Sequence, residues 1–293
     1  MCEVTPGCAI IYIMKASLSA IVISSVVSIV SALAFAGDAG EVSVAVGVRK
    51  SGETKTVTLP GGATMEMIWC APGTFKMGSP IGEKGRFSDE MQHSVTLTKG
   101  FWLGKYEVTQ RQWESVMRSN HSRFKGADNP MENVSWYDCE AFAKRVGTAF
   151  GGKARLPTEA EWEYACRAGG DAPFSGSGVV SEMAWYEANS DHQTHEVGRN
   201  KPNAWGFYDM HGNVLEWCSD WFSNPTGDAI DPKGPPSGSF KALRGGCWFS
   251  LDSDCRCAYR LKREPNLRNC IFGFRLACSD CDAAPSTSGG EQK

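Results

Sequence analysis

The chain has 293 residues, and its formal net charge at pH 7 is −3. An acidic balance without a block of basic residues excludes nucleic acid and an anionic membrane surface as the main partner. The hydrophobic fraction of 42% is sufficient for one buried core, while 32 glycines and 10 tryptophans favour irregular segments that large aromatic side chains anchor.

The N-terminal residues have the pattern of a signal peptide. Lys15 precedes an apolar stretch at 17–36, which ends in the small-x-small tripeptide (AFA, 34–36) that signal peptidase recognises. We therefore expect residues 1–36 to be removed and the chain to be exported to the periplasm or the extracellular space, with no membrane partner after cleavage. An uncleaved membrane anchor is the alternative, because the stretch is close in length to the shortest transmembrane helices.

Residues 37–64 are polar with short alternating stretches, so they are expected to form a linker or an added edge strand. Three helices are expected beyond them. Each opens with a capping box, in which two side chains bond backbone N–H groups that a helix start leaves unpaired. The boxes are Thr109 with Gln112, Ser135 with Asp138, and Thr158 with Glu161. Gly147 and Gly169 are expected to stop the second and third helices.

Strands are expected at 67–78, 93–108, 242–249, 255–261 and 271–278, with only brief elements from 169 to 243. Residues 279–293 are a low-complexity tail that is expected to be disordered. The predicted fold class is α+β, with one domain over 65–278 and a large irregular fraction.

Twelve cysteines occur, and ten remain once the leader takes Cys2 and Cys8 with it. An even number in an exported chain indicates structural disulfides first, and metal or redox chemistry second. The pairing cannot be deduced from one sequence.

Seven motifs follow one another along the chain. They read PGTFKMGS at 72–79, KYEVT at 105–109, PMENVSW at 130–136, RLPTEAEWEYA at 155–165, GFYDMHGNVLEW at 206–217, RGG at 244–246 and GFR at 273–275. This ordered series resembles the sulfatase-modifying-factor family, which includes formylglycine-generating enzymes and non-catalytic modules. The resemblance implies a variant of the C-type-lectin-like fold, the formylglycine-generating-enzyme fold, over 65–278.

The motif at 206–217 implies a calcium site. Two carboxylates with backbone carbonyls between them on a tight turn offer the hard oxygen ligands that Ca²⁺ prefers. By resemblance, a structural Ca²⁺ is held by Asp209, Glu216 and the carbonyls of Gly212 and Val214. On the residues alone, a plain turn with Glu216 paired to a cation is the simpler interpretation.

The segment after the RGG motif is the catalytic one in the family. There, two cysteines bind Cu(I), and O₂ oxidises a client cysteine to an aldehyde; soft thiolates suit Cu(I). Counted from the glycines, the first copper cysteine falls on Ser250 and the second on Cys255, while the family serine is Cys247. The copper pair is therefore not intact, and Cys247 with Cys255 is the remaining candidate catalytic pair. Cys255 and Cys257 would face opposite sides of a strand and are not expected to share an ion.

Structural disulfides are the simpler interpretation of these cysteines. Cys218 with Cys255 or Cys257 is one example, and Cys166 with Cys278 is another, because both flank elements that the family ties together.

Arg260 and Trp248 are the candidate substrate-binding residues. Arg260 matches a family arginine near the substrate groove, and its planar guanidinium offers several donors to a peptide. The alternative for both side chains is a structural role, as a brace for buried loops and as a core anchor. For Arg275 the bracing role is preferred.

Two functions are consistent with the sequence. One is an exported formylglycine-generating oxidoreductase that uses Cu(I) and O₂ on a cysteine of a client sulfatase or another peptide. The other is a non-catalytic C-type-lectin-like binding or structural module that keeps the scaffold and has lost the copper. Ser250 favours the module, and so does the stretch from Cys255 to Arg260, which is three residues shorter than in the family. Family membership favours the enzyme, and the fold alone does not decide.

Overall fold

The computed structural model describes residues 49–279. Three predicted segments lie outside the described residues. They are the signal peptide, residues 37–48 of the expected linker or edge strand, and the tail beyond 279. Within 49–279, no helix combines the length and apolar character needed to cross a membrane.

All three predicted helices are present and begin at the predicted capping boxes. They are α1 (Gln110–Met117), α2 (Trp136–Val146) and α3 (Glu159–Arg167). In each, the N-cap hydroxyl accepts from the third backbone N–H and the third side chain accepts from the N-cap N–H. Helix α2 ends at Gly147 as expected and continues into the 3₁₀ turn η1 (Gly147–Phe150). A single further turn, α4 (Val180–Met183), lies in the irregular region.

The largest sheet has five strands in the order β1-β2-β5-β12-β6. Its strands are β1 (Thr54–Thr58), β2 (Thr64–Cys70), β5 (Phe101–Gly104), β12 (Ala277–Cys278) and β6 (Ala154–Arg155). β12, which ends the described chain, pairs with both β5 and β6, while β1 is an edge strand against β2. This sheet therefore brings the two ends of the described domain together.

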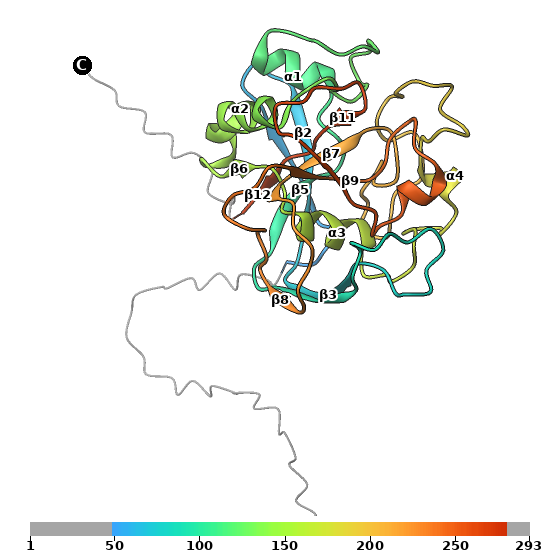
Figure 1. The fold of residues 1–293 in the computed structure, drawn as a ribbon. Coiled ribbons are helices and arrows are strands. Elements are labelled where there is room, and N and C mark those ends of the chain that lie inside the picture. Colours follow the sequence, from blue (N-terminus) through green and yellow to red (C-terminus); the bar gives the residue numbers. More distant parts are fainter. Residues whose placement is uncertain (1–48, 280–293) are drawn as a thin grey trace, which may run out of the picture. The chain divides into compact units, whose positions relative to one another are not determined.

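Two smaller sheets complete the fold (Figure 1). One has the order β10-β9-β7-β11 and consists of β10 (Leu261–Arg263), β9 (Lys241–Arg244), β7 (Leu215–Trp221) and β11 (Phe272–Gly273). The other has the order β3-β4-β8 and consists of β3 (Gly73–Met77), β4 (His93–Leu97) and β8 (Ala229–Ile230). Helix α3 contacts β3 in one of these sheets and β7 and β9 in the other, so it connects the two smaller sheets.

Two expectations about strands are wrong. Residues 255–261 do not form a strand: the 3₁₀ turn η2 (Asp252–Cys255) comes first, and β10 begins only at Leu261. β7 is a seven-residue strand within the region where only brief elements were expected. β7 is buried at nearly every position, so it lacks the alternation that marks a half-exposed strand in sequence.

Aromatic stacking anchors the helical side of the core. The Phe142 ring lies parallel to the Trp113 ring at 5.3 Å and meets the Phe274 ring edge-on at 5.5 Å. These three side chains join α1, α2 and the segment before β12. Phe142 is fully buried, so it is a principal contact of α2 with the rest of the domain.

Replacing this ring is expected to destabilise the domain strongly. Phe142→Ala should lower the free energy of unfolding by about 3–5 kcal/mol, because it removes buried apolar surface and leaves a cavity. Chemical denaturation followed by tryptophan fluorescence measures the change. Lys144→Ala, on the exposed side of the same helix, is the control and should change it by less than about 0.5 kcal/mol. Equal effects of the two variants would contradict the assignment.

Candidate functional site

The predicted catalytic segment begins with a tight glycine turn after β9. Gly245 and Gly246 both have left-handed backbones, with φ of 97° and 74°. A Cβ on Gly246 would lie 2.7 Å from the Cys255 sulfur, so only glycine allows this approach. The turn therefore folds the segment back so that Cys255 packs against its beginning.

Cys247 and Cys255 are buried thiols in this turn. Their exposed fractions are 2% and 0%, and burial raises the pKa of both above the usual range of a thiol. Ser250, at the position counted for the first copper cysteine, places its hydroxyl oxygen 3.5 Å from the Cys247 sulfur and accepts from the Cys247 N–H at 3.1 Å. Cys247 thus has a hydroxyl neighbour where the family pattern has a second thiol.

The disulfide pairs expected from the sequence are wrong for the described residues. Cys166, Cys218, Cys255 and Cys257 all have free thiols. Cys278 is disulfide-bonded, so its partner is not Cys166. The Cys166 sulfur instead lies 3.5 Å from the Cys257 sulfur.

Arg260 and Trp248 hold the chain in place. The Arg260 guanidinium forms two bonds to the Glu159 carboxylate, at 2.6 and 2.7 Å, and also donates to the Asp89 and Ser223 carbonyls. The Trp248 Nε1–H donates to the Cys270 carbonyl at 3.1 Å, and the side chain is almost wholly buried. These contacts favour the structural interpretation of both side chains, although Arg260 also lines a pocket.

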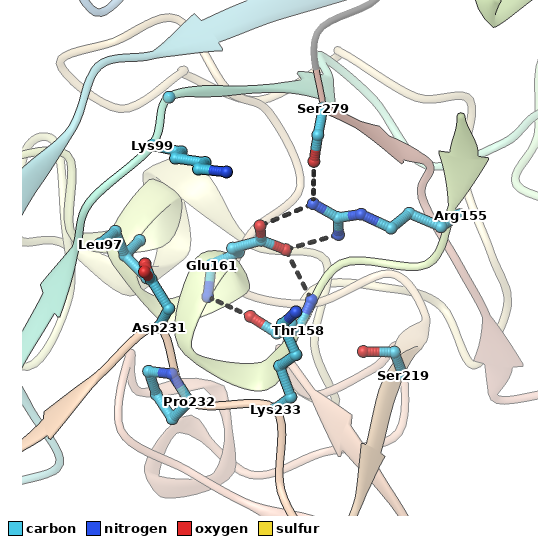
Figure 2. Close-up of a pocket in the computed structure, with 11 residues that line it drawn as sticks. Leu97, Lys99, Arg155, Thr158, Glu161, Ser219, Asp231, Pro232, Lys233 and Ser279 are labelled. Carbon is cyan, nitrogen blue, oxygen red and sulfur yellow. Dashed lines mark hydrogen bonds and ion pairs between the residues drawn. The ribbon is translucent and has the colours of Figure 1, made fainter. Parts of the chain in front are cut away.

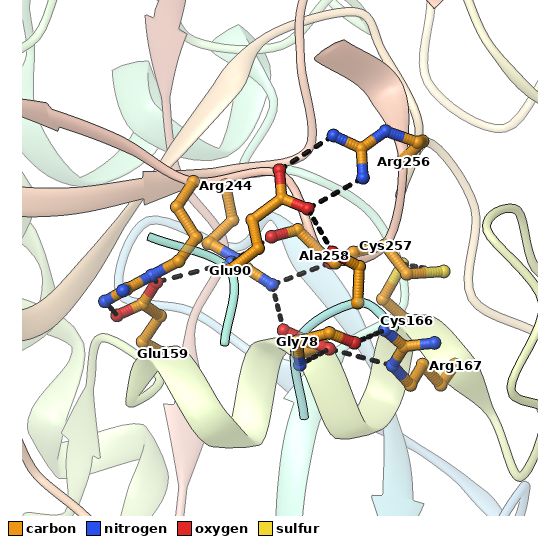
Figure 3. A network of polar contacts seen from close by, with 12 residues as sticks. Gly78, Glu90, Glu159, Cys166, Arg167, Arg244, Arg256, Cys257 and Ala258 are labelled. Atoms are coloured by element: carbon orange, nitrogen blue, oxygen red, sulfur yellow. Dashed lines mark hydrogen bonds and ion pairs between the residues drawn. The ribbon is translucent and has the colours of Figure 1, made fainter. Parts of the chain in front are cut away.

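Through its ion pair with Glu159, Arg260 belongs to a buried network of arginines and glutamates. Figure 3 shows the part of this network around Arg244 and Arg256. Its members with ion pairs are Arg167, Arg244, Arg256 and Arg260, with Glu83, Glu90, Glu159 and Glu163. Arg244 lies at the centre and is fully buried. It bonds Glu163 and Glu159 on α3, and it donates to the Cys257 carbonyl at 2.7 Å. The network thus fixes the segment after η2 against α3.

Arg256 extends the network to the loop at 80–90. It bonds Glu90 through both of its terminal nitrogens, at 2.8 and 2.7 Å, and Glu83 at 2.7 Å. Its contacts also hold down the pKa of Glu90, although burial alone would raise it. The sequence analysis missed Arg256, Glu159 and Glu163 as a group. Arg244 lies in the RGG motif and both glutamates lie in the motif at 155–165, but spacing along the chain does not reveal which charges meet.

A pocket of about 390 Å³ lies beside the network, between α3 and the loop at 223–234. We name it the Asp220 pocket. Asp220 is 4% exposed, and its Oδ2 accepts from the Glu159 N–H and from the Ser219 hydroxyl, both at 3.0 Å. His93 also lines the pocket and donates from Nδ1 to the Met91 carbonyl, which leaves Nε2 as an acceptor. The pocket therefore offers acceptors from fully or largely buried side chains.

A second hollow of about 330 Å³, the Arg155 pocket, shares Pro232 and Lys233 with the first. Figure 2 shows Arg155 bonded to Glu161 and Ser279 on one side of it, with Lys99 and Lys233 on the others. The two hollows together place several charged side chains around the N-terminal end of α3. Neither was apparent from the sequence.

The two carboxylates among the predicted calcium ligands have different partners. Both oxygens of Glu216 accept from Arg275 at 2.6 Å, and one also accepts from the Trp162 indole N–H. Asp209 is buried, accepts from the Gly198 N–H through Oδ2, and leaves Oδ1 without a partner among the described residues. Asp209 suits a cation, whereas Glu216 is already neutralised, so the four residues do not fit Ca²⁺ as one ligand set in this arrangement. Calcium here stays a prediction.

One group of three soft donors occurs among the described residues. The ligand atoms of Cys166, His211 and Cys257 all lie within 4.8 Å of one another, and all three side chains are buried. His211 lies within the motif at 206–217, and the pairings suggested by the sequence gave the two cysteines other partners.

Residues 53–279 match the sulfatase-modifying factor enzyme 1-like domain. The chain belongs to this family. The formylglycine-generating enzyme of Streptomyces coelicolor is 35% identical over 58% of this chain and 61% of its own length. The chaperone protein LppX of Paenibacillus barcinonensis is 32% identical over 73% of this chain and 89% of its own length. The serine/threonine-protein kinase pkn1 of Chlamydia pneumoniae is 32% identical over 72% of this chain, which spans only 38% of the kinase.

Solved structures confirm the predicted α+β formylglycine-generating-enzyme fold, the C-type-lectin-like variant. Treponema denticola variable protein 1 superposes with a TM-score of 0.71 at 34% identity, over 77% of this chain and 99% of its own. PvdO from Pseudomonas aeruginosa superposes with a TM-score of 0.70 at 28% identity, over 79% and 99%. The family thus includes proteins with several different names on one scaffold.

The buried Asp220 makes a testable contribution to the pH dependence of stability. Burial, together with the nearby Glu159 carboxylate, raises the pKa of Asp220 to about 7. The folded protein therefore retains a proton between about pH 4 and 7 that the unfolded chain has lost, so this group favours folding at low pH and loses that advantage as the pH rises to 7.

Asp220→Asn should remove this dependence. The difference in unfolding free energy between the native chain and the variant should fall by about 3 kcal/mol from pH 4 to 7, as measured by denaturation at each pH. The exposed Asp171→Asn serves as the matched control and should follow the native chain. A parallel pH profile for Asp220→Asn would show that Asp220 titrates normally.

Proposed function

We propose that this chain is an exported, non-catalytic module of the family that binds polypeptide. The observation that carries the proposal is the burial of the two candidate catalytic thiols. Cys247 is 2% exposed and Cys255 is not exposed at all. An oxidase of this type must let a client thiol reach the metal that the two cysteines hold, and sulfurs sealed inside the domain give it no access.

The ligand chemistry at Ser250 supports the same conclusion. A hydroxyl oxygen is a poor ligand for Cu(I), which selects thiolates and thioethers. Ser250 instead closes the turn by accepting from the Cys247 N–H, and its own N–H donates to the Cys247 carbonyl at 2.9 Å. Both contacts are those of a structural turn.

The names of relatives favour a polypeptide as the ligand. LppX, which this chain matches over 89% of its length, is named a chaperone, and the Streptomyces relative is named for generating formylglycine. A polypeptide-binding scaffold that has lost its chemistry fits both. A sulfatase is the client that the family resemblance suggests.

The Asp220 and Arg155 pockets are the proposed binding surface. They adjoin through Pro232 and Lys233, and they offer charges of both signs around the loop at 223–234. The Glu159–Arg260 ion pair forms part of the lining of the Asp220 pocket. Fixed polar groups around a concave surface give orientation and specificity to a bound chain.

A second function, copper-dependent oxidation, is favoured by one observation: Cys247 and Cys255 are free thiols and not a disulfide. Mass spectrometry of a cysteine-containing sulfatase-type peptide, incubated with the full chain, Cu(I) and O₂, separates the two functions. We expect the peptide mass to stay unchanged. An aldehyde product that is lost in Cys255→Ser and kept in Cys139→Ala would establish the oxidase and refute the proposal.

Binding is tested by filling the mouth of the Asp220 pocket. Thr226, an exposed residue of its lining, is replaced by Trp, and the exposed Thr148 elsewhere is replaced by Trp as the matched control. Native chain on a sensor surface is presented with an array of unfolded sulfatase-derived peptides and, separately, with a glycan array. We expect peptide binding that falls at least tenfold in Thr226→Trp and not in Thr148→Trp. Binding to glycans alone, or equal binding by both variants, would contradict the proposed ligand and surface.

A further inference from the structure

Two buried hydrogen-bond acceptors, Asp220 and His93, line the Asp220 pocket. Asp220 is 4% exposed, and the two hydrogen bonds that it accepts, from the Glu159 N–H and the Ser219 hydroxyl, both end on Oδ2. His93 is 9% exposed, and its Nδ1–H donates to the Met91 carbonyl, so its Nε2 carries the lone pair of the ring. No contact described within residues 49–279 uses that Nε2. The pocket therefore presents acceptors that its own walls do not fill.

The cations of the lining do not serve these acceptors. The Arg260 guanidinium is bound to the Glu159 carboxylate and donates to two backbone carbonyls. Lys233, the other cation of the lining, is exposed and also lines the Arg155 pocket. Because Arg260 and Glu159 neutralise each other, the carboxylate of Asp220 is the buried charge that remains. A buried carboxylate is costly until a positive group pairs with it, so the pocket favours a cationic ligand.

We propose that the Asp220 pocket binds a primary ammonium group of the bound polypeptide, held by the Asp220 carboxylate and the His93 Nε2. The ammonium group belongs either to a lysine side chain or to the N-terminus of the polypeptide. This inference rests on the proposed function for its ligand class, and it names the group that the pocket selects. An ammonium group has three N–H donors and no acceptor, which suits a site whose buried side chains accept.

The remaining lining suits an alkyl chain. Apolar side chains of the pocket come from β3, α3, β8 and the loop at 223–234, and they are Met77, Ala160, Ala229, Pro225 and Pro232. Such walls contact the methylene groups of a lysine while its ammonium group reaches a polar site. Its volume of about 390 Å³ also lies in the range of pockets that take small ligands.

A metal ion is the alternative cation for a carboxylate and an imidazole in one pocket. Zinc sites in proteins use three or four protein ligands. Within residues 49–279, the only three His, Cys, Asp or Glu donors within 4.8 Å of one another are Cys166, His211 and Cys257. Asp220 and His93 thus lack a third protein ligand for a metal ion, whereas an ammonium group requires only acceptors.

The affinity for an ammonium group is expected to rise with pH. Burial, together with the nearby Glu159 carboxylate, raises the pKa of Asp220 to about 7. The carboxyl is therefore mostly protonated at pH 6 and mostly ionised at pH 8, while a lysine ammonium stays charged at both. Affinity should follow the ionised fraction and increase about tenfold over this range.

Several elements contribute charges around Asp220, which itself lies on β7. The charged or titratable groups are Glu159 and Glu161 on α3, Lys241 on β9, His93 on β4, and Asp228, Lys233 and Arg260 in the other lining segments. Asp220→Asn removes the titration of Asp220 alone and leaves all of these in place. It should therefore both weaken binding and flatten its pH profile.

Titration of the full ¹⁵N-labelled chain with small ammonium compounds tests the proposal at pH 7. N-acetyl-lysine amide represents the side chain, glycine amide represents the N-terminus, and N-acetyl-norleucine amide is the uncharged control. The backbone amide signal of Glu159 is the reporter, because its N–H donates to Asp220 Oδ2. We expect a saturable shift with at least one ammonium probe and none with the norleucine probe. The affinity should fall at least tenfold in Asp220→Asn and stay unchanged in the exposed control Asp171→Asn.

A second arm identifies the source of the ammonium group. Sulfatase-derived peptides that bind the native chain are tested again after acetylation of their lysines or of their N-terminus. A tenfold loss on one of these acetylations assigns the group and supports the proposal. Peptide binding that neither acetylation weakens would overturn the proposal while leaving the polypeptide-binding function intact. A shift with the small probes in the absence of any peptide binding would support the ammonium site and contradict the polypeptide-binding function.

Other results would also overturn the proposal. They are equal shifts with the norleucine and lysine probes, or an unchanged affinity in Asp220→Asn. If Asp220→Asn does not fold, the native chain and Thr226→Trp decide. A flat affinity for N-acetyl-lysine amide between pH 6 and 8, or full binding in Thr226→Trp, would then refute the site.

Discussion

Buried charge is the constraint on which the irregular part of this fold depends. An arginine taken out of water costs several kcal/mol unless a carboxylate and carbonyls replace its hydration. Arg244, Arg256 and Arg260 all come from the end of β9 or the irregular segment after η2, and none of them is exposed by more than 9%. Glutamates on α3 and on the loop at 80–90 must therefore lie within reach. Ion pairs hold this segment in place, as the backbone hydrogen bonds of a β-sheet would hold a strand.

The same network explains why the thiols of the 245–257 turn are inaccessible. The arginines draw the segment onto α3, and the Gly245–Gly246 turn lets its two ends pack closely. Cys247 and Cys255 are then enclosed by the chain that carries them. In this scaffold, the ion pairs between arginines and glutamates line the pockets at the start of α3. The same ion pairs bury the turn at 245–257, which is the catalytic segment in the family.

Short sequence motifs correctly predicted the features that depend only on neighbouring residues, such as the helix starts. The capping boxes were right because the N-cap hydroxyl and the side chain three residues later interact within one helical turn. The strand expected at 255–261 failed because arginine and cysteine side chains there are buried on several sides at once, in contacts with α3 and with the loop at 80–90. Arg260 and Trp248 were found as special residues, but their partners were not.

The sequence by itself determined the family, the α+β class, the helix starts and the departure at Ser250 from the copper pattern. These features can be identified from contiguous motifs or from the order of the motifs along the chain. Only the tertiary structure decided that Glu216 neutralises Arg275, that Asp220 opens into a pocket and that Cys166 meets Cys257. The reason is physical: these groups lie far apart along the chain, and their contacts depend on how loops of irregular backbone pack, which no local periodicity records.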